Sequence, residues 1–311
     1  MRIRCLLLIL SLMTGGFVFP MRADAGTFQR PGVGFQVINP TDCVGGGPLS
    51  LWPQFFPFPT FGIGYRQRVW VLSCNNDGNG NSSILEGPGS GLQSQPGAAA
   101  GISTSPYDTP IAVNAAGEPY VWNANVGNWS PMPRGSDWQG SAACFWSIAG
   151  GGDTYSSTWA LTDNLTDCAY PVGSTNLRIQ KWDPFKKMWR AIRPDGGEFG
   201  LAVSLGVSPD GVLWAVNAGG NIYRSATNNI PVLMPGCARK VAVGVQENAW
   251  VLGCQWNNDK RGYPVYRWNT HLERWFLVPG YALDIAVAPD TGMPWIIDPQ
   301  YRLEAWFGPF E

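Results

Sequence analysis

Histidine and charge are both scarce in this chain of 311 residues, which has one histidine, His271, and 14% charged residues. A Ser-His-Asp or Cys-His arrangement would have His271 as its base, and no orienting partner is evident in the stretch "RWNTHLERW". We interpret His271 as a turn residue and predict no catalytic residue and no enzymatic activity. A hydrolase is less favoured, because no arginine cluster or carboxylate pair recurs at repeated positions.

The sequence also lacks an excess of basic or acidic residues and a recognisable set of metal ligands. With a formal net charge of −1, the chain presents no basic field for nucleic acid or anionic lipid, so neither surface is favoured. A zinc site would need more histidine or cysteine than remains free once disulfides form. The stretch "CNNDGNGNSS", beginning at Cys74, spaces oxygen side chains like calcium ligands but lacks the central glycine and distal glutamate of an EF-hand loop. The sequence therefore predicts no metal, no cofactor and no nucleic-acid partner.

Long hydrophobic runs are absent except near the N-terminus, where two arginines precede a short apolar run and the small-residue pattern Ala23-Asp24-Ala25. This arrangement predicts a secretory signal peptide over residues 1–25 and a single domain over residues 26–311. A membrane anchor is the alternative. The run is short for a membrane span and no second run follows, so we predict no membrane insertion. The expected location is secreted or periplasmic.

Glycine, proline and tryptophan are plentiful, with 39, 26 and 16 residues, which favours many short strands divided by turns. One phrase also recurs: "LGVSPDGVLWAVN" at 205–217 returns as "IAVAPDTGMPWIID" at 285–298. Each phrase joins an apolar strand, a Pro-Asp turn and a strand with an aromatic anchor. Repeats of several short strands predict an all-β, six-bladed β-propeller. Its six predicted anchors are Trp70, Tyr120, Trp159, Trp214, Trp250 and Trp295.

The anchors alternate between two forms, which predicts three units of two blades. In one form a cysteine and a longer polar loop follow the anchor. In the other form the anchor is followed three residues later by Asn123, Asn217 or Asp298.

The chain stops one strand short of a complete sixth blade, so the segment around Phe35 to Asn39 is expected to complete that blade and close the ring.

Removal of the signal peptide takes away Cys5 and leaves six of the seven cysteines. An even number in an oxidising compartment predicts disulfides. The repeat favours pairs that face each other across the first hairpin of a blade. Two pairs fit directly, and the pair of the first blade follows by equivalence across a Pro- and Phe-rich insertion. The predicted disulfides are Cys144–Cys168, Cys237–Cys254 and Cys43–Cys74.

The stretch "RWFLVPGYALDIAVAPDTGMPWIID" places Trp275, Val278, Gly280, Ile285 and Trp295 where tectonin repeats carry Trp, Val, Gly, an aliphatic residue and Trp. The chain therefore resembles the tectonin-type β-propellers, best over its second half. The resemblance implies a six-bladed lectin or recognition protein and glycan binding, without a fixed set of ligand residues. The cysteines of the alternate blades depart from the family pattern.

The predicted ligand-binding loops follow the second strand of each blade, and such loops share one face of a propeller. Trp256 stands two residues after Cys254 beside amide and carboxylate side chains, and Tyr170 has the same offset from Cys168. An aromatic ring packs on the C–H face of a sugar while polar groups bind its hydroxyls. The predicted site residues are Trp256, Asn257, Asn258, Asp259, Tyr170, Asp167, Asn164, Asn76, Asp77, Asn123, Asn217 and Asp298.

The favoured function is a secreted, non-enzymatic lectin that binds a glycan or glycoconjugate on a cell surface. Equivalent loops on one face would form up to three weak sites, which hold a surface that displays many copies of a sugar by avidity. A protein–protein interaction scaffold is the alternative, because polar loops are also what ordinary turns have. A propeller hydrolase is less favoured than either.

Overall fold

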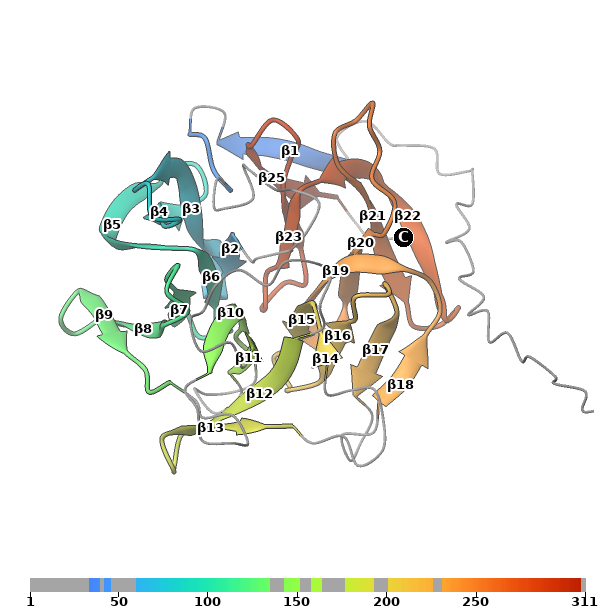
Figure 1. Ribbon diagram of the computed structural model, residues 1–311. Helices are drawn as coiled ribbons and strands as arrows, with labels where there is room; N and C mark the ends of the chain where they lie inside the picture. Colours follow the sequence, from blue (N-terminus) through green and yellow to red (C-terminus); the bar gives the residue numbers. More distant parts are fainter. Residues whose placement is uncertain are drawn as a thin grey trace, which may run out of the picture.

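Six antiparallel sheets stand around a central axis, so the chain folds as the six-bladed β-propeller that the sequence predicts (Figure 1). In the described part of the chain, regular structure is strand apart from two 3₁₀ turns, Tyr65–Gln67 and Val245–Glu247. Neither turn is long and apolar enough to cross a membrane. The computed structural model describes residues 34–39, 42–45, 60–134, 143–151, 158–163, 177–192, 201–225 and 231–308.

Each blade is a meander whose first strand lies nearest the axis and whose fourth strand lies at the rim (Figure 1). Blades 1 to 3 consist of β2 (Phe61–Ile63), β3 (Arg68–Asn76), β4 (Ser82–Pro88) and β5 (Gln93–Ala99); β6 (Gly101–Thr104), β7 (Pro110–Val113), β8 (Pro119–Asn123) and β9 (Asn128–Pro131); and β10 (Cys144–Ala149), β11 (Trp159–Asp163), β12 (Leu177–Asp183) and β13 (Met188–Ala191), with β14 (Leu201–Ala202) beside β12. Blades 4 to 6 consist of β15 (Ser204–Val207), β16 (Leu213–Val216), β17 (Ile222–Ser225) and β18 (Pro231–Met234); β19 (Ala238–Val243), β20 (Ala249–Gly253), β21 (Tyr263–Asn269) and β22 (Arg274–Ala282); and β23 (Asp284–Val287), β24 (Pro294–Ile297), β25 (Leu303–Phe307) and β1 (Gly34–Asn39).

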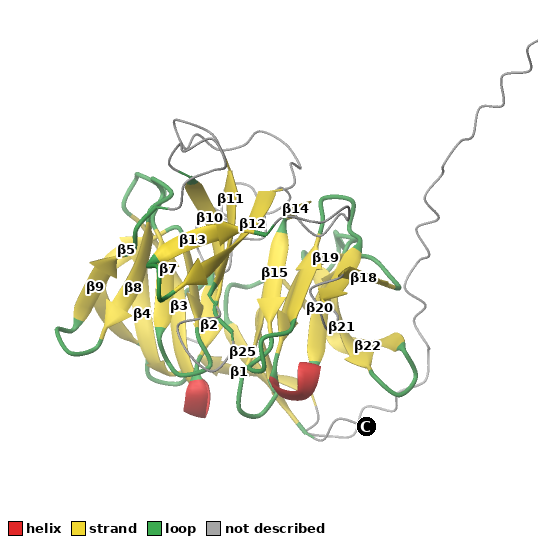
Figure 2. Cartoon of the chain, turned by 90° about the horizontal axis from the view of Figure 1, so that it is seen from below, coloured by secondary structure: helices red, strands yellow, loops and turns green. Residues whose placement is uncertain are grey.

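The alternating strand directions define two faces of the ring. Inner strands begin and second strands end on the face that we call upper. Inner strands and third strands end on the opposite, lower face. The two 3₁₀ turns follow inner strands, and Figure 2 shows them in red at the lower edge of the molecule. The loops after the second strands therefore share the upper face with the connections between blades.

The large aromatic anchors fit because the inner strand places a small residue opposite each of them. Trp214 is 1% exposed opposite Gly206, and a Cβ atom on that glycine would lie 3.0 Å from Val243 of the next blade. Alternation of small and large residues lets a tapering β-structure fill its interior. The same pairing joins Trp70 with Gly62, Trp159 with Ala149, Trp250 with Ala242 and Trp295 with Ala286.

Tryptophans on the third and fourth strands hold neighbouring blades together. In blade 5, the ring centroids of Trp268 and Trp275 lie 5.1 Å apart, and both rings pack on the anchor Trp214 of blade 4. Trp275 Nε1 also donates to the Pro235 carbonyl at 2.7 Å. Such aromatic pairs contribute about 0.5–1.5 kcal/mol of stability beyond the free energy gained by burying their surface area. The same hydrogen bond recurs from Trp129 to Pro96 and from Trp189 to Pro133.

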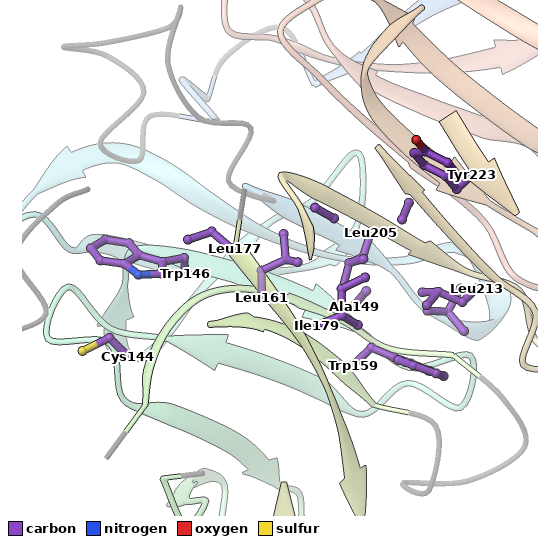
Figure 3. Packing of buried hydrophobic residues seen from close by; sticks show 13 residues of the cluster. Cys144, Trp146, Ala149, Trp159, Leu161, Leu177, Ile179, Leu205, Leu213 and Tyr223 are labelled. Atoms are coloured by element: carbon purple, nitrogen blue, oxygen red, sulfur yellow. The ribbon is translucent and has the colours of Figure 1, made fainter. Parts of the chain in front are cut away.

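The apolar residues of the described chain form six clusters, one between each pair of neighbouring blades. Figure 3 shows the cluster between blades 3 and 4, where Leu161 and Ile179 of blade 3 lie together with Leu205 and Leu213 of blade 4. Each sheet is therefore covered on both faces, which explains why inner and second strands such as β15 and β16 are buried along their whole length.

The aromatic anchor predicted for blade 2 is wrong by one strand. Tyr120 lies on the third strand, β8, and Ile111 of β7 occupies the anchor position opposite Ser103. An aliphatic residue suffices there, because Trp182 and Trp189 of blade 3 pack into the same cluster and fill the space.

Because Tyr120 lies on a third strand and not on a second strand, Asn123 lies on the opposite face from the predicted one. Asn123 ends a third strand and therefore lies on the lower face, so its predicted place beside Asn217 and Asp298 is wrong. The counterpart of those two residues in blade 2 is Asn114, whose Oδ1 accepts from the Glu118 N–H at 2.9 Å in a turn of the same geometry.

The structure contains two of the predicted disulfides, Cys43–Cys74 in blade 1 and Cys237–Cys254 in blade 5. Their Cα atoms lie 5.4 and 5.5 Å apart, within the range that a disulfide spans without backbone movement. Cys144 of blade 3 is also disulfide-bonded. Its predicted partner, Cys168, lies outside the described residues, so that pairing stays a prediction.

The insertion of blade 1 interrupts its inner strand without breaking the ladder. Before the insertion Val44 bridges Ser73 of β3, and after it the Thr60 carbonyl accepts from the Leu72 N–H at 2.8 Å. Insertion at a bulge adds chain where pairing is already interrupted. The inner strands of blades 3 and 5 carry a bulge at the corresponding place, between Phe145 and Ser147 and between Ala238 and Lys240.

The N-terminal strand supplies the fourth strand of blade 6. β1 pairs antiparallel with β25, from Gly34 opposite Phe307 to Asn39 opposite Leu303. Phe35 also packs edge to face on Trp306, with ring centroids 5.3 Å apart. This pairing joins the two ends of the propeller, and its importance for ring closure stays a prediction.

Deletion of residues 26–40 is expected to abolish cooperative thermal unfolding, because it exposes the edge of β25 and removes the strand that joins the ends of the ring. Circular dichroism melting curves measure this. Deletion of residues 26–32, which leaves β1 intact, is the control. A 26–40 deletion that melts like the parent would rule out a closing role for β1.

Candidate functional site

In five of the six blades a buried polar residue stands at the same level where the inner strand begins, and blade 2 has Gly101 there. Equivalent positions are identified by their partners on the second strands, which are aliphatic in every blade. Apolar residues fill most of the remaining inner-strand positions, so a polar level near the axis is a distinct feature. The residues at this level are Thr60, Gly101, Ser147, Ser204, Lys240 and Asp284.

Asp284 is the centre of a buried network that joins blades 5, 6 and 1. Its Oδ1 binds Lys240 Nζ of blade 5 and accepts from the Ile285 N–H at 2.6 Å. Its Oδ2 accepts from the Thr60 N–H at 2.7 Å and from Thr60 Oγ1 at 2.6 Å. Burial lowers the pKa of Lys240, and the Asp284 carboxylate opposes this shift. Each of the two charges therefore interacts with the other in place of the water that burial removes, as a buried ion pair requires.

A small recess opens beside this network at the upper face, between blades 5, 6 and 1. Its lining includes the polar residues Asp284 and Thr60 and the aromatic residues Tyr263 and Tyr301. Polar groups among aromatic and aliphatic surfaces are the usual composition of a small-molecule site. The recess is lined by Gly45, Thr60, Tyr263, Leu283, Asp284, Ile297 and Tyr301.

The backbone of Tyr301 adopts a conformation that favours glycine. Its φ angle is +60°, and the corresponding turn residues of blades 2 and 4 are Gly117 and Gly220, with φ angles of +69° and +83°. A side chain in this left-handed region costs about 1 kcal/mol or more. Blade 6 therefore carries a tyrosine at the recess where backbone stability alone would favour glycine.

The loop after β20 brings the predicted residue Trp256 next to the recess. Its half-buried ring packs on Tyr263 with ring centroids 5.0 Å apart and an interplanar angle of 74°. Asn257 accepts a backbone hydrogen bond within the loop, and its Nδ2 donates to the Tyr281 hydroxyl at 3.4 Å. These contacts place the third predicted loop beside Tyr263 and Tyr281. Its remaining predicted residues, Asn258 and Asp259, are exposed.

A cluster of two carboxylates and one guanidinium lies in the turn that carries Tyr301. Arg302 Nε donates to Asp298 Oδ2 at 2.7 Å. Burial, followed by the charge of Asp298, raises the pKa of Glu304 to about 7, and Arg302 opposes this rise. One cation cannot neutralise both carboxylates at this partly buried place. Glu304 therefore takes up a proton near neutral pH.

Other predicted site residues hold their own turns. Asn217 Oδ1 accepts from the Asn221 N–H at 2.9 Å, and Asp298 is 2% exposed with Oδ1 accepting two backbone N–H groups. Asn76 Oδ1 accepts from a backbone N–H at 2.7 Å. Hydrogen bonds from the Asn81 side chain and nearby N–H groups lower the pKa of Asp77. Ligand binding by these residues stays a prediction.

The predicted loop of blade 3 cannot be compared with the others, since Tyr170, Asp167 and Asn164 lie outside the described residues. The loop of blade 1 is described, and it packs on blade 2 through Asn81, whose Oδ1 accepts from the Ala115 N–H at 2.6 Å. It shows no counterpart of Trp256 there, because Asn76 occupies the same offset from its cysteine. In the described residues no cluster of three acidic, cysteine or histidine side chains could hold a metal ion.

Several residues of the recess were not predicted from the sequence. A signal for two of them exists, because "KVAV" and "DIAV" each place a charged residue directly before an apolar strand segment. A charge in such a strand is buried and requires a partner. No comparable feature of the sequence marks Tyr263 or Tyr301 as a residue of the recess. The unpredicted residues are Thr60, Lys240, Asp284, Tyr263, Tyr301 and Glu304.

Comparison with solved structures shows the propeller fold over most of the chain. A gluconolactonase from Xanthomonas campestris matches with a TM-score of 0.55 and 11% identity, over 90% of this chain and 99% of the other. Virginiamycin B lyase from Staphylococcus aureus matches with a TM-score of 0.51 and 11% identity, over 89% and 99%. A chain of the mitotic checkpoint complex gives 0.52 and 9%, over 95% and 100%. No family model and no curated protein matches the sequence.

The prediction of a non-enzymatic protein is contradicted by these neighbours. They include a gluconolactonase and a lyase, so enzymes are built on this fold, and the scarcity of histidine is no ground for excluding catalysis here. At 11% identity the likeness shows the fold alone. The tectonin-type family is not among the findings, and that resemblance rests on the sequence.

Replacement of Lys240 by methionine is expected to cost about 3–5 kcal/mol of unfolding free energy, because it leaves the Asp284 carboxylate buried without its cation. Urea unfolding measures the loss. The double variant Lys240→Met, Asp284→Leu removes both charges and is expected to recover much of it. A single variant that loses less than about 1 kcal/mol would contradict a buried ion pair.

Glu304 is expected to make the unfolding free energy depend on pH. Its pKa of about 7 lies above the ordinary glutamate value of 4.5, so its stabilising protonated form is complete below pH 4.5 and is lost as pH rises through 7. Glu304→Gln stays neutral, and the stability difference between the variant and the wild type should grow between pH 5 and pH 8. Parallel stability curves from urea titrations would contradict the raised pKa.

Proposed function

We propose that the protein binds a glycan or glycoconjugate at the recess on its upper face. The observation that carries this proposal is Tyr301, which lines the recess in a backbone conformation that its counterparts in blades 2 and 4 meet with glycine. A residue kept against a conformational cost indicates a role other than stability.

The chemistry of the recess suits a sugar. Pyranose rings present C–H faces that pack on aromatic rings and hydroxyls that pair with amides, phenols and carboxylates. Tyr263, Tyr301 and Trp256 supply the rings, and Tyr281 and Asn257 lie beside them. The Asp284 carboxylate already accepts four hydrogen bonds, so it shapes the recess more than it binds the ligand.

The disulfides and the predicted signal peptide support a secreted or periplasmic location, where glycans of a cell surface are available. The resemblance to tectonin-type lectins supports the same ligand class. The Cys237–Cys254 bond holds the base of the Trp256 loop and lowers the ordering cost of binding. A protein partner is the alternative occupant of this face.

Tyr301→Gly separates binding from folding. The variant is expected to keep its unfolding free energy within about 1 kcal/mol, because relief of the left-handed backbone offsets the loss of the ring. Its affinity for a glycan found by array screening should fall about tenfold, as should that of Trp256→Ala. Calorimetric titration measures affinity, and NMR of the same mixtures detects any conversion of the ligand.

Tyr107→Ala is the matched control, because Tyr107 is 62% exposed on the lower face. Its affinity should equal that of the wild type. Unchanged affinity in Tyr301→Gly and Trp256→Ala would move the site away from the recess. An array without a glycan hit for the intact, disulfide-bonded protein would favour the protein-partner alternative.

A further inference from the structure

We infer that the recess is pH-sensitive, because Glu304 holds the turn that carries Tyr301 when its carboxyl group is protonated and loosens that turn when it is ionised. Affinity for a glycan is therefore higher in mildly acidic than in mildly alkaline solution. This regulation rests on the proposed function of the recess, since it concerns the ligand bound there. The effect of Glu304 on the turn itself does not depend on a ligand.

The turn that carries Tyr301 is organised by one buried carboxylate, that of Asp298. Its Oδ1 accepts from the N–H groups of Gln300 and Arg302, each at 2.8 Å, and its Oδ2 accepts from Arg302 Nε at 2.7 Å. The carboxylate is therefore bonded to the residues on both sides of Tyr301, which has a φ angle of +60° and lines the recess. A change in the forces on Asp298 consequently acts on the position of the Tyr301 ring.

Glu304 of β25 belongs to the same cluster, in which two carboxylates share one guanidinium. Arg302 Nη2 lies 2.5 Å from Asp298 Oδ2 and 3.5 Å from Glu304 Oε1. Two carboxylates with one cation at a partly buried place repel each other when both are ionised. Asp298 accepts its three hydrogen bonds as a carboxylate, so the proton is held by Glu304. Burial, followed by the charge of Asp298, raises the pKa of Glu304 to about 7.

The two forms of Glu304 act on the turn in opposite directions. Below neutral pH its carboxyl group donates a hydrogen bond to Asp298 and does not compete for Arg302. Above neutral pH a second negative charge repels Asp298 and attracts Arg302. The hydrogen bonds that hold the turn then weaken, and the Tyr301 ring gains freedom that a ligand must remove again on binding. Affinity consequently falls as pH rises through 7.

The titratable groups around Glu304 leave it as the one that changes its charge there near neutral pH. The strands β1 and β24 carry no titratable side chain. Blade 5 brings Tyr263 and Tyr281 to the upper face, and burial raises the pKa of Tyr263 while the charge of Arg239 opposes the rise. His271, the single histidine, is exposed on the lower face, in the turn between β21 and β22. The charged residues of the Trp256 loop are Asp259, Lys260 and Arg261.

The first test needs no ligand and uses NMR of the intact, disulfide-bonded protein from about pH 5.5 to about pH 8.5. The amide resonances of Gln300 and Arg302 are expected to shift with a midpoint near pH 7, where Glu304 ionises. They should stay in place in Glu304→Gln, whose amide imitates the protonated carboxyl group. Resonances that do not titrate, or that still titrate in Glu304→Gln, would overturn the inference whatever the protein binds.

The second test is calorimetric titration of the glycan found by array screening over the same pH range. Affinity should fall about fivefold in the wild type and stay at its acidic value in Glu304→Gln. His271→Gln is the matched control, because it removes the lower-face group and should keep the wild-type pH profile. Melting curves confirm that both variants are folded.

The outcomes separate the pH dependence from the glycan site. An affinity that does not change with pH would overturn the inference and leave the glycan site standing. So would a pH dependence that disappears in His271→Gln and persists in Glu304→Gln. An array without a glycan hit would contradict the proposed function, while the NMR titration still decides whether Glu304 controls the turn.

Discussion

The ion pair of Lys240 and Asp284 is the interaction on which the rest of the site depends. Inner strands of neighbouring blades touch only near the axis, and this pair joins blades 5 and 6 there while Thr60 joins blade 1. The junction matters because blade 6 is the blade in which the first and last described strands, β1 and β25, pair with each other. A buried pair supplies little net stability, but it tolerates few alternative arrangements and so fixes these three blades relative to one another.

Fixing those blades also fixes the recess, whose lining comes from all three of them. Farther from the axis, tryptophans of the outer strands pack on the anchor of the preceding blade and hold the sheets apart at a set distance. The upper face is therefore rigid at its base and polar at its turns.

The fold could be predicted from the sequence because its repeat carries a physical pattern. Trp214 and Trp295 stand after Pro-Asp turns opposite small inner-strand residues, and the pairing of an aromatic anchor with a small residue recurs in five of the six blades. The register failed in blade 2, where Ile111 replaces the aromatic anchor and a turn of similar composition lies one hairpin later.

The candidate site was predicted only in part. Trp256 was found because its offset from Cys254 marks a loop on the upper face. Tyr263 and Tyr301 reach the recess from separate blades, and no local pattern records that approach. Asp298 has the composition of a binding residue and the geometry of a turn residue, since its carboxylate accepts from the backbone of its own turn.

Hydrogen–deuterium exchange with and without a bound glycan tests the central claim that the recess between blades 5, 6 and 1 holds the ligand. The account predicts slower exchange of backbone amides in peptides that cover 254–263 and 298–304, with no change in those that cover 183–190. Protection confined to the lower face, or to blades 2 to 4, would contradict it.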